Sequence, residues 1–410
     1  MATTRREFIH NGIAFISLGL TIPTFLLRAA AAPAGPLSAP QGKILVVIEM
    51  SGGNDGLNTV IPHADPQYAK LRPSIGIAAA DVVPLGSGLG LHPKMVPLKG
   101  LYEKGQLAVV TGVGYPNPNR SHFQSMDIWQ TGDPLLNTET HSGWLARYLD
   151  ADGHFAGKPL SSLGMSGGLP LALTAAQNGF ASVYSSDGML FSGEDDDQKK
   201  KRAAVASLYA QGSVAGSPAE FVRNVAGNAY ANSDTLKTIL AKSGLGSVEY
   251  PPNDDLASGL QTVARLITGG LETRVYYLNL GGFDTHSNQP DQHGNLLGSL
   301  ASSLSAFFQD LTRHHRADDV IAMTFSEFGR RVHENGSAGT DHGAASVMFL
   351  AGGGLKGGIY GDYPSLTDLD DGDLRFHTDF RQIYATLLDK WLGTPSQPVL
   401  GGSFAHLGFV

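Results

Sequence analysis

The sequence predicts an α/β protein with a doubly wound, mostly parallel sheet that is flanked by helices. Short apolar runs with many β-branched residues, such as ILVVIEM at 44–50, are typical of strands buried on both faces of a parallel sheet. These runs alternate along the chain with segments of helical periodicity, such as 295–313. Because strands that alternate with helices form βαβ units, we expect an open sheet with helices on both faces.

The apolar spacing and the residues that end each segment place the individual elements. Strands are predicted at 44–50, 107–113, 274–280, 320–325 and 346–351, and helices at 96–105, 260–268, 295–313 and 379–391. A further helix is expected after Ser121, which stands where an N-cap residue belongs. We therefore place one α/β domain at 43–410.

Residues 185–260 differ from the rest of this domain. They carry the charged run Glu194 to Arg202, and helical-looking stretches in them are broken by Gly, Ser and Asn. We interpret the segment as a helical insertion on the main sheet. The acidic part of the run is more typical of a solvated helix end than of a calcium site.

The first 32 residues have the features of an export signal. Arg5 and Arg6 precede the apolar stretch GIAFISLGLTIPTFLL, and alanines follow at 29–32. Paired arginines, an apolar core and small residues are typical of a signal read by the twin-arginine export machinery. The stretch is shorter than the ~20 residues of a membrane span. We therefore expect cleavage near Ala32, a flexible leader at 33–42, no permanent span and a periplasmic or extracellular location, with an uncleaved anchor as the alternative.

Composition excludes several kinds of protein and site. The formal net charge of −8 gives no basic surface for nucleic acid. The sequence contains no Cys, so disulfides, thiolate metal ligands and a cysteine nucleophile are ruled out. Neither a Gly-x-Ser-x-Gly elbow nor a phosphate-binding loop of the Walker type is present.

Acidic and histidine residues lie at the ends of the predicted strands. In open α/β sheets ligands bind at the carboxyl ends of strands, and carboxylates with imidazoles are ligands of divalent metals that activate oxygen chemistry. The candidate ligands are Asp55, Asp284, His286, Glu327, Asp341, His342 and His377. They predict one or two divalent ions, with zinc, manganese, magnesium and calcium left open.

Two pairs among these ligands are the most specific signals. Asp284 and His286 offer an oxygen and a nitrogen in an Asp-x-His segment after a double glycine. Asp341 and His342 are adjacent, so they could supply one ligand to each of two ions about 4 Å apart. Asp55, by contrast, sits in an Asn-Asp-Gly segment that also suits an ordinary turn.

The alternatives for His377 and for the arginines stay open at this point. His377 would complete the ligand set, or its segment would start a helix that is capped by Thr378 or Asp379. Arg330 and its neighbour Arg331 would clamp an oxyanion such as phosphate or sulfate. Alternatively, Arg331 would form a surface ion pair with Glu334.

Ser121 is the candidate nucleophile. At a helix N-terminus its developing alkoxide would face the positive end of the helix dipole, and a nearby metal ion would lower its pKa. His122 would assist as an acid or base. The alternative for Ser121 is a plain N-cap.

Several segments together resemble the domain-of-unknown-function-1501 family, which is similar in turn to the alkaline phosphatase and sulfatase superfamily. They cover nearly the whole mature chain and include VIEMSGGNDGLNTVIP, GVGYPNPNRSHFQSMDIWQTG, GGFDTHSNQ and TFSEFGRRVHENGSAGTDHG. The resemblance implies an alkaline-phosphatase-like fold and a metal site. The Asp-x-His spacing and the position of Glu327 depart from the superfamily pattern, so the resemblance does not fix the register of the ligands.

The resulting hypothesis is an exported metal-dependent hydrolase of phosphate or sulfate esters in small molecules or polymers. Ser121 would attack phosphorus or sulfur. The alternative from another class is a non-catalytic exported protein, stabilised by metal, that binds a cell-surface polymer or a protein partner.

Overall fold

The structure is a computed structural model, and it describes residues 42–136, 142–152 and 248–410 together with short stretches between 155 and 243. The predicted export signal, the leader up to residue 41 and the charged run at 194–202 lie outside the described residues, as does most of the predicted insertion. In the described part of the insertion, residues 235–242 and the start of α9 (Asp255–Thr268) are helical. No described helix is both long and apolar enough to cross a membrane.

A nine-stranded sheet forms the centre of the fold, in the order β11-β5-β10-β9-β1-β8-β6-β7, with β14 paired to β5. The strands are β1 (Ile44–Glu49), β5 (Leu107–Gly114), β6 (Ser162–Gly164), β7 (Ala181–Ser182), β8 (Val275–Asn279), β9 (Val320–Phe325), β10 (Ser346–Gly352), β11 (Gly358–Tyr360) and β14 (Thr378–Asp379). The predicted class, an α/β fold on a mostly parallel sheet, is confirmed.

One strand departs from the parallel arrangement. β10 runs antiparallel to both β5 and β9, whereas β1, β8 and β9 are parallel to one another. A parallel return to the same sheet needs a crossover, usually a helix. The connection from β9 to β10 contains no helix, so β10 comes back in the opposite direction.

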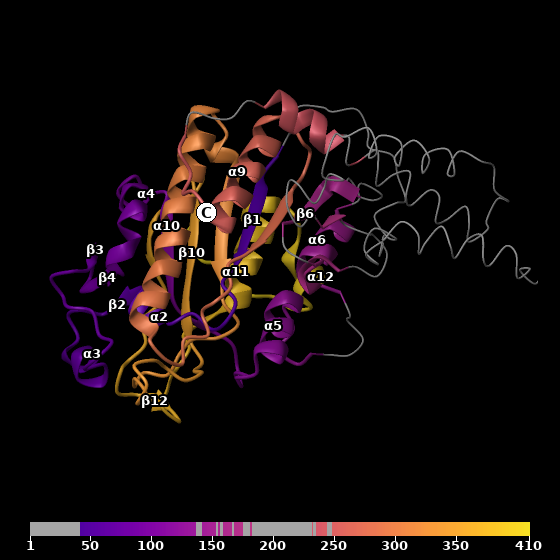
Figure 1. Cartoon of the computed structure of the whole chain (residues 1–410). Helices are drawn as coiled ribbons and strands as arrows, with labels where there is room; N and C mark the ends of the chain where they lie inside the picture. The colour runs from indigo at the N-terminus through magenta and orange to yellow at the C-terminus, as the bar shows by residue number, and fades with distance from the viewer. Residues whose placement is uncertain are drawn as a thin grey trace, which may run out of the picture.

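Helices cover both faces of the sheet (Figure 1). Alternate residues of β1 enter two separate cores, with Ile44, Val46 and Ile48 in one, and Leu45 and Val47 in the other. The first core includes α9, α10 (Gln289–Arg313) and the 3-10 helix η1 (Pro93–Leu98). The second includes α5 (His122–Thr131), α6 (Trp144–Ala151), α11 (Phe380–Thr386) and α12 (Ser396–Leu400). Burial on both faces explains why the strands are apolar throughout.

Two predicted helices differ from the structure in type. The segment predicted at 96–105 is the 3-10 helix η1 followed by α4 (Lys99–Glu103), because Pro97 cannot donate the hydrogen bond that an α-helix needs there. The last helix begins as α11 and continues as the π-helix η6 (Leu387–Leu392). Asp379 caps α11, with Gln382 completing the capping box, which settles the capping role in favour of Asp379.

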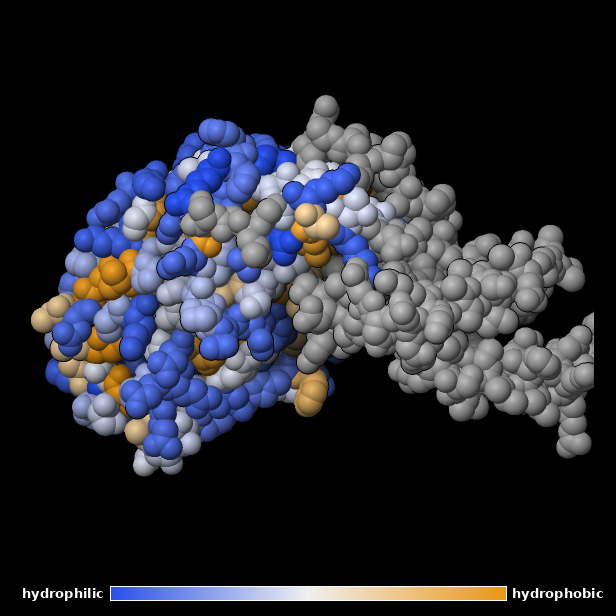
Figure 2. All heavy atoms as spheres, turned by 45° about the horizontal axis from the view of Figure 1, so that its top comes forward, coloured by the Kyte–Doolittle hydropathy of each residue, from blue (hydrophilic) through white to orange (hydrophobic). Residues whose placement is uncertain are grey.

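Smaller elements lie beside the main sheet. One is a three-stranded antiparallel sheet in the order β2-β4-β3, which was not predicted from the sequence. The other is a hairpin after β11 whose two strands, β12 and β13, are two residues long. These elements are α2 (Gly56–Thr59), β2 (Val60–Ile61), α3 (Pro66–Leu71), β3 (Val83–Gly86), β4 (Leu89–Leu91), β12 (Leu369–Asp370), β13 (Asp373–Leu374) and the 3-10 turns η3 (Pro159–Ser161), η4 (Leu171–Leu173) and η5 (Ala317–Asp319). Figure 2 shows a mostly hydrophilic face with small, separate hydrophobic spots on the described surface.

Candidate metal centre

The sheet topology brings five loops to one edge. β8, β1 and β9 are adjacent and parallel, so the loops that follow them leave from the same edge. β10 runs the opposite way and therefore begins at that edge, and β5, antiparallel to β10, ends there. The segments that carry Asp284, Glu327, Asp341 with His342, and Ser121 with His122 thus meet, although they are far apart in the sequence.

Three imidazoles surround the carboxylate of Asp284. The Nε2 atoms of His286 and His342 lie 3.1 and 3.3 Å from Asp284 Oδ1. They are 3.0 Å from each other. From the other side, His122 Nε2 lies 3.7 Å from Asp284 Oδ2. One ligand atom each from His122, Asp284 and His342 fall within 4.8 Å of one another, so these residues form a candidate metal-binding group.

Hydrogen bonds on the far side of two rings fix their tautomers. His342 Nδ1 lies 2.9 Å from the carbonyl oxygen of Arg120, and His122 Nδ1 lies 2.8 Å from Glu327 Oε1. Because these oxygens accept hydrogen bonds, both Nδ1 atoms carry the proton and donate it. Each Nε2 atom then points toward Asp284, and a hydrogen bond at the far ring nitrogen is the usual way a protein orients a histidine ligand.

His286 is held in the same manner but at a more open position. Its Nδ1 lies 3.3 Å from Asp341 Oδ1. Asn335 Nδ2 donates to the backbone oxygen of His286 at 2.9 Å and to Asp341 Oδ1 at 3.2 Å. Those hydrogen bonds lower the pKa of Asp341, so it stays ionised and continues to accept from His286. The third ring is therefore also oriented with Nε2 toward Asp284.

A buried arginine positions Asp284. Arg330 is 1% exposed, and its Nη2 donates to Asp284 Oδ1 at 2.7 Å. Burial acts to raise the pKa of Asp284, but the hydrogen bond and charge of Arg330 outweigh it and lower the pKa overall. Burial lowers the pKa of His342. The carboxylate is therefore ionised and this imidazole neutral, the forms in which both bind metals.

The separations within the group of three are compatible with one metal ion. Ligands at zinc-like bond lengths in a tetrahedron are about 3.3 Å apart, and the Nε2 atoms of His342 and His122 lie 3.3 and 3.7 Å from the carboxylate oxygens of Asp284. His286 contacts Asp284 and His342 but is not part of that group of three.

Two glycines allow the loops to approach this closely. Gly52 has φ of +121°, and a Cβ added there would lie 2.4 Å from the backbone nitrogen of Asp284. A Cβ on Gly343 would lie 2.5 Å from the backbone of Arg330. Only glycine fits where two backbones are this close. The Gly52 N–H also donates to Glu327 Oε1 at 2.9 Å, which joins the loops after β1 and β9.

Asp55 lies near this edge, but its carboxylate is used elsewhere. The residue is fully buried and caps α2, accepting from Leu57 N at 3.2 Å and Asn58 N at 3.4 Å. Its other oxygen accepts from Arg72 and from Gln289 Nε2. Both oxygens are therefore engaged inside the fold, and we leave Asp55 out of the metal group.

Three other sequence candidates have distinct positions. Glu327 is buried and holds His122 and Gly52 instead of facing Asp284. Asp341 is mostly exposed and holds His286. His377 is exposed beside the end of β5, where its backbone nitrogen donates to Gly112, and the structure does not bring it into the group.

The two arginines do not form an anion clamp. Arg330 donates to Gly53 O at 2.7 Å and to Thr340 O at 2.8 Å, besides Asp284, so its guanidinium ties loops together. Arg331 lies 3.4 Å from Asp371 and 3.7 Å from Asp373. The alternative, an ion pair between Arg331 and Glu334, does not form. The carboxylate of Glu334 instead accepts hydrogen bonds from Ser74 and from the backbone nitrogen of Ile75.

Ser121 stands at the N-terminus of α5, next to His122. Its side chain is exposed and does not cap the helix. Ser121 is thus the N-cap residue by position, but its hydroxyl makes no capping hydrogen bond. Its role as a nucleophile stays a prediction. His122, expected as an acid or base, instead points Nε2 at Asp284 and joins the candidate ligands.

Sequence reasoning missed the residues that support the ligands. Asn335 and the carbonyl of Arg120 orient two imidazoles. Glu49, at the end of β1, is buried and accepts from Gln130 Nε2 at 2.9 Å and Asn279 Nδ2 at 2.8 Å. The contacts of Arg120 and Glu49 join segments far apart in the chain, so no local pattern signals them, although Glu49 does end a strand as the other candidates do. Asn335 lies only six positions from Asp341, but no known motif links the two.

Comparisons with known proteins concern the family and the fold. The family described as "Protein of unknown function (DUF1501)" matches residues 42–397. No curated protein matches the sequence. The PsFucS1 sulfatase from Pseudoalteromonas sp. is similar in structure, with 11% identity, 88% of this chain and 68% of that chain covered, and a TM-score of 0.39.

Two further solved structures are similar at the same level. A protein in the alkaline phosphatase superfamily from Vibrio parahaemolyticus has 11% identity, covers 92% of this chain and 76% of its own, and gives a TM-score of 0.42. The alkaline phosphatase from the Antarctic bacterium TAB5 has 8% identity, covers 77% and 95%, and gives 0.34. At these TM-scores the likenesses carry no argument about activity, which has to come from the site itself.

Proposed function

The chain belongs to the DUF1501 family, and we propose that it is an exported, metal-dependent hydrolase of phosphate or sulfate esters. The main support is the set of three imidazoles with anchored Nδ1 atoms and Nε2 atoms directed at Asp284. Asp284 is 48% exposed and His286 45% exposed, so this cluster adds little to the core. A half-exposed polar cluster of this kind is more typical of a binding or catalytic site than of a structural one.

His122, Asp284 and His342 would hold one divalent ion, with His286 as a further ligand. When bound, such an ion stabilises negative charge on a phosphoryl or sulfuryl oxygen as a Lewis acid. Asp341 is an exposed carboxylate beside this group and would be the ligand of a second ion. Glu327 and Arg330 would keep His122 and Asp284 in their orientations.

Ser121 would be the nucleophile. Its Oγ would form a bond to phosphorus or sulfur while the bond to the ester oxygen breaks. The proton of the Ser121 hydroxyl would pass to water, and water would give a proton to the departing alcohol oxygen. A water molecule would then cleave the bond to Ser121, releasing phosphate or sulfate and restoring the hydroxyl. The N-terminus of the ten-residue helix α5 would favour the serine oxygen when it carries negative charge.

Elemental analysis and an ester screen test this proposal together. We expect the purified protein to contain zinc or manganese and to hydrolyse 4-nitrophenyl phosphate, bis(4-nitrophenyl) phosphate or 4-nitrophenyl sulfate. Asp284→Asn should lose both metal and turnover, whereas Ser121→Ala should keep the metal and lose turnover. Asp81→Asn, which changes an exposed carboxylate away from this group, is the matched control.

The outcomes separate the candidate functions. Metal content that is unchanged in Asp284→Asn would contradict the assigned site. Bound metal without turnover of any ester would instead favour the alternative, an exported binding protein that metal stabilises.

Export by the twin-arginine pathway is part of the proposal and has its own test. The paired Arg5 and Arg6 with the apolar stretch after them support it. Replacing both arginines with lysine should retain the protein in the cytoplasm. Unchanged recovery from the periplasm would contradict this route.

A further inference from the structure

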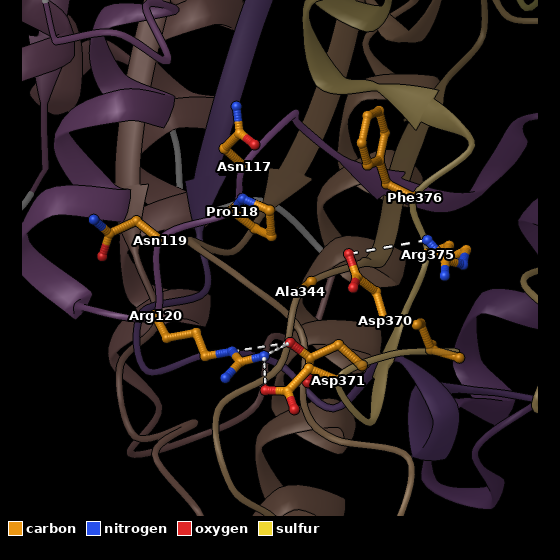
Figure 3. Close-up of a pocket in the computed structure, with 11 residues that line it drawn as sticks. Asn117, Pro118, Asn119, Arg120, Ala344, Asp370, Asp371, Arg375 and Phe376 are labelled. Atoms are coloured by element: carbon orange, nitrogen blue, oxygen red, sulfur yellow. Dashed lines mark hydrogen bonds and ion pairs between the residues drawn. The ribbon is translucent and has the colours of Figure 1, made fainter. Parts of the chain in front are cut away.

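A pocket of about 660 Å³ includes Arg120, the residue before Ser121, in its lining (Figure 3). One wall is the loop 117–120, and the other is the hairpin and following segment at 370–376. The volume falls in the range of pockets that bind small molecules.

The pocket and the metal centre share a piece of backbone. Arg120 lines the pocket, and its carbonyl oxygen accepts the hydrogen bond from His342 Nδ1 at 2.9 Å. Ser121 is the next residue along the chain. The lining thus ends one residue before the proposed nucleophile and includes the residue whose carbonyl oxygen orients His342.

The charges of the pocket are already paired with one another. Arg120 forms an ion pair with Asp373 and lies 3.6 Å from Asp371. Arg375 lies 4.0 Å from Asp370, and Figure 3 shows these groups facing across the hairpin. Arg331 adds a third guanidinium group, 3.4 Å from Asp371. Three guanidinium groups thus face the three carboxylates of the lining, so a charged ligand would find no large unbalanced charge. This pairing favours a ligand that is polar but neutral.

Asp373 belongs to the pocket wall itself. It is 2% exposed, and its Oδ2 accepts from Arg120 Nε at 2.9 Å. Its Oδ1 is enclosed, with Arg331 Nε 3.7 Å away. The carboxylates that a molecule in the pocket can reach are therefore those of Asp370 and Asp371, which are 73% and 80% exposed.

The remaining lining suits a molecule with many hydroxyl groups. Hydroxyl groups both donate and accept, so they can bridge paired carboxylate, guanidinium and amide groups such as Asn117 and Asn119. Pro118 and the ring of Phe376 add apolar surface, which fits the C–H faces of a sugar ring. We propose that this pocket binds a neutral carbohydrate. On the proposed function, that carbohydrate is the alcohol part of the ester, positioned with its phosphate or sulfate toward Ser121.

Direct binding tests the pocket without requiring turnover. Cellotetraose, maltotetraose, xylotetraose and chitotetraose would be titrated into the metal-loaded protein, with saturation-transfer NMR to detect contact and calorimetry to measure affinity. We expect at least one to bind. Asp370→Asn combined with Asp371→Asn should weaken that binding by roughly tenfold or more, because hydrogen bonds to charged groups are lost.

These variants should fold normally. Both side chains are largely exposed, and asparagine tolerates the left-handed conformation of Asp371, at φ 52°. Asp81→Asn is again the control and should leave the affinity unchanged. Failure of all four sugars to bind, or binding that the double variant does not weaken, would overturn the pocket assignment.

The result also separates this inference from the hydrolase proposal. Sugar binding without hydrolysis of any ester would leave the carbohydrate pocket standing and remove the hydrolase. Hydrolysis of 4-nitrophenyl esters without sugar binding would support the hydrolase and remove the carbohydrate pocket.

Discussion

Replacing Asp55 with asparagine should destabilise the fold without removing the metal. The side chain is isosteric, and asparagine is as good an N-cap as aspartate, so the cap on α2 should survive. The change instead removes the negative charge that pairs with buried Arg72. Breaking one partner of a buried ion pair costs about 3–5 kcal/mol because the other charge is left uncompensated.

The structure places the expected cost at the lower end of that range. Arg72 keeps three neutral acceptors, which are Asn58 Oδ1 at 2.9 Å, Val332 O at 3.0 Å and Arg331 O at 2.9 Å. We therefore expect a loss of about 3 kcal/mol in the free energy of unfolding. That is a large fraction of the ~5–15 kcal/mol that stabilises a typical domain.

Urea unfolding followed by circular dichroism measures this loss, and elemental analysis of the folded variant measures its metal. We expect a lower urea midpoint with an unchanged slope and unchanged metal content. The Asp284→Asn protein should show the opposite pattern, losing metal with a smaller effect on the metal-free fold. Loss of metal from Asp55→Asn at an unchanged midpoint would refute the assignment of Asp55 to the fold.

Three more predictions follow from the same contacts. Arg330→Lys keeps the charge but cannot reach Gly53, Thr340 and Asp284 together, so metal affinity in a chelator competition should fall about 10–100-fold. Gly52→Ala should weaken metal binding as well, since its Cβ would lie 2.4 Å from Asp284 N; an alanine variant with wild-type affinity would contradict the close approach. Burial lowers the pKa of His293 to about 3. In the unfolded chain the imidazole of His293 takes up a proton near pH 6.5. Because only the unfolded state gains this proton, His293 lowers the free energy of unfolding progressively as pH falls from about 6.5 toward 3, and has no such effect above that window. Over this pH window the urea midpoint of His293→Gln should change less with pH than that of the unaltered protein.

Much of the architecture could be predicted from local sequence patterns. The strand at 320–325 has the predicted bounds, and 44–50, 107–113, 274–280 and 346–351 differ from the structure by a residue or two at their ends. These runs are buried on both faces, and that environment leaves a continuous apolar signal in the sequence. Helix types were harder, because Pro97 and the π-helical turn after α11 change hydrogen bonding without changing the apolar spacing.

The sequence by itself determined the class of fold, the family and the pool of ligand-type residues at the strand ends, because each depends on residues close together in the chain. Only the tertiary structure decided which members of that pool face one another. Asp55 is engaged by Arg72, whereas Asp284 meets three imidazoles that arrive from separate loops. The direction of β10 and the pairing of loop 117–120 with the segment 370–376 were decided in the same way. Whether a side chain has an atom left to bind a metal depends on which groups it hydrogen-bonds. For Glu327, one of those groups is the Gly52 N–H, 275 positions away in the chain.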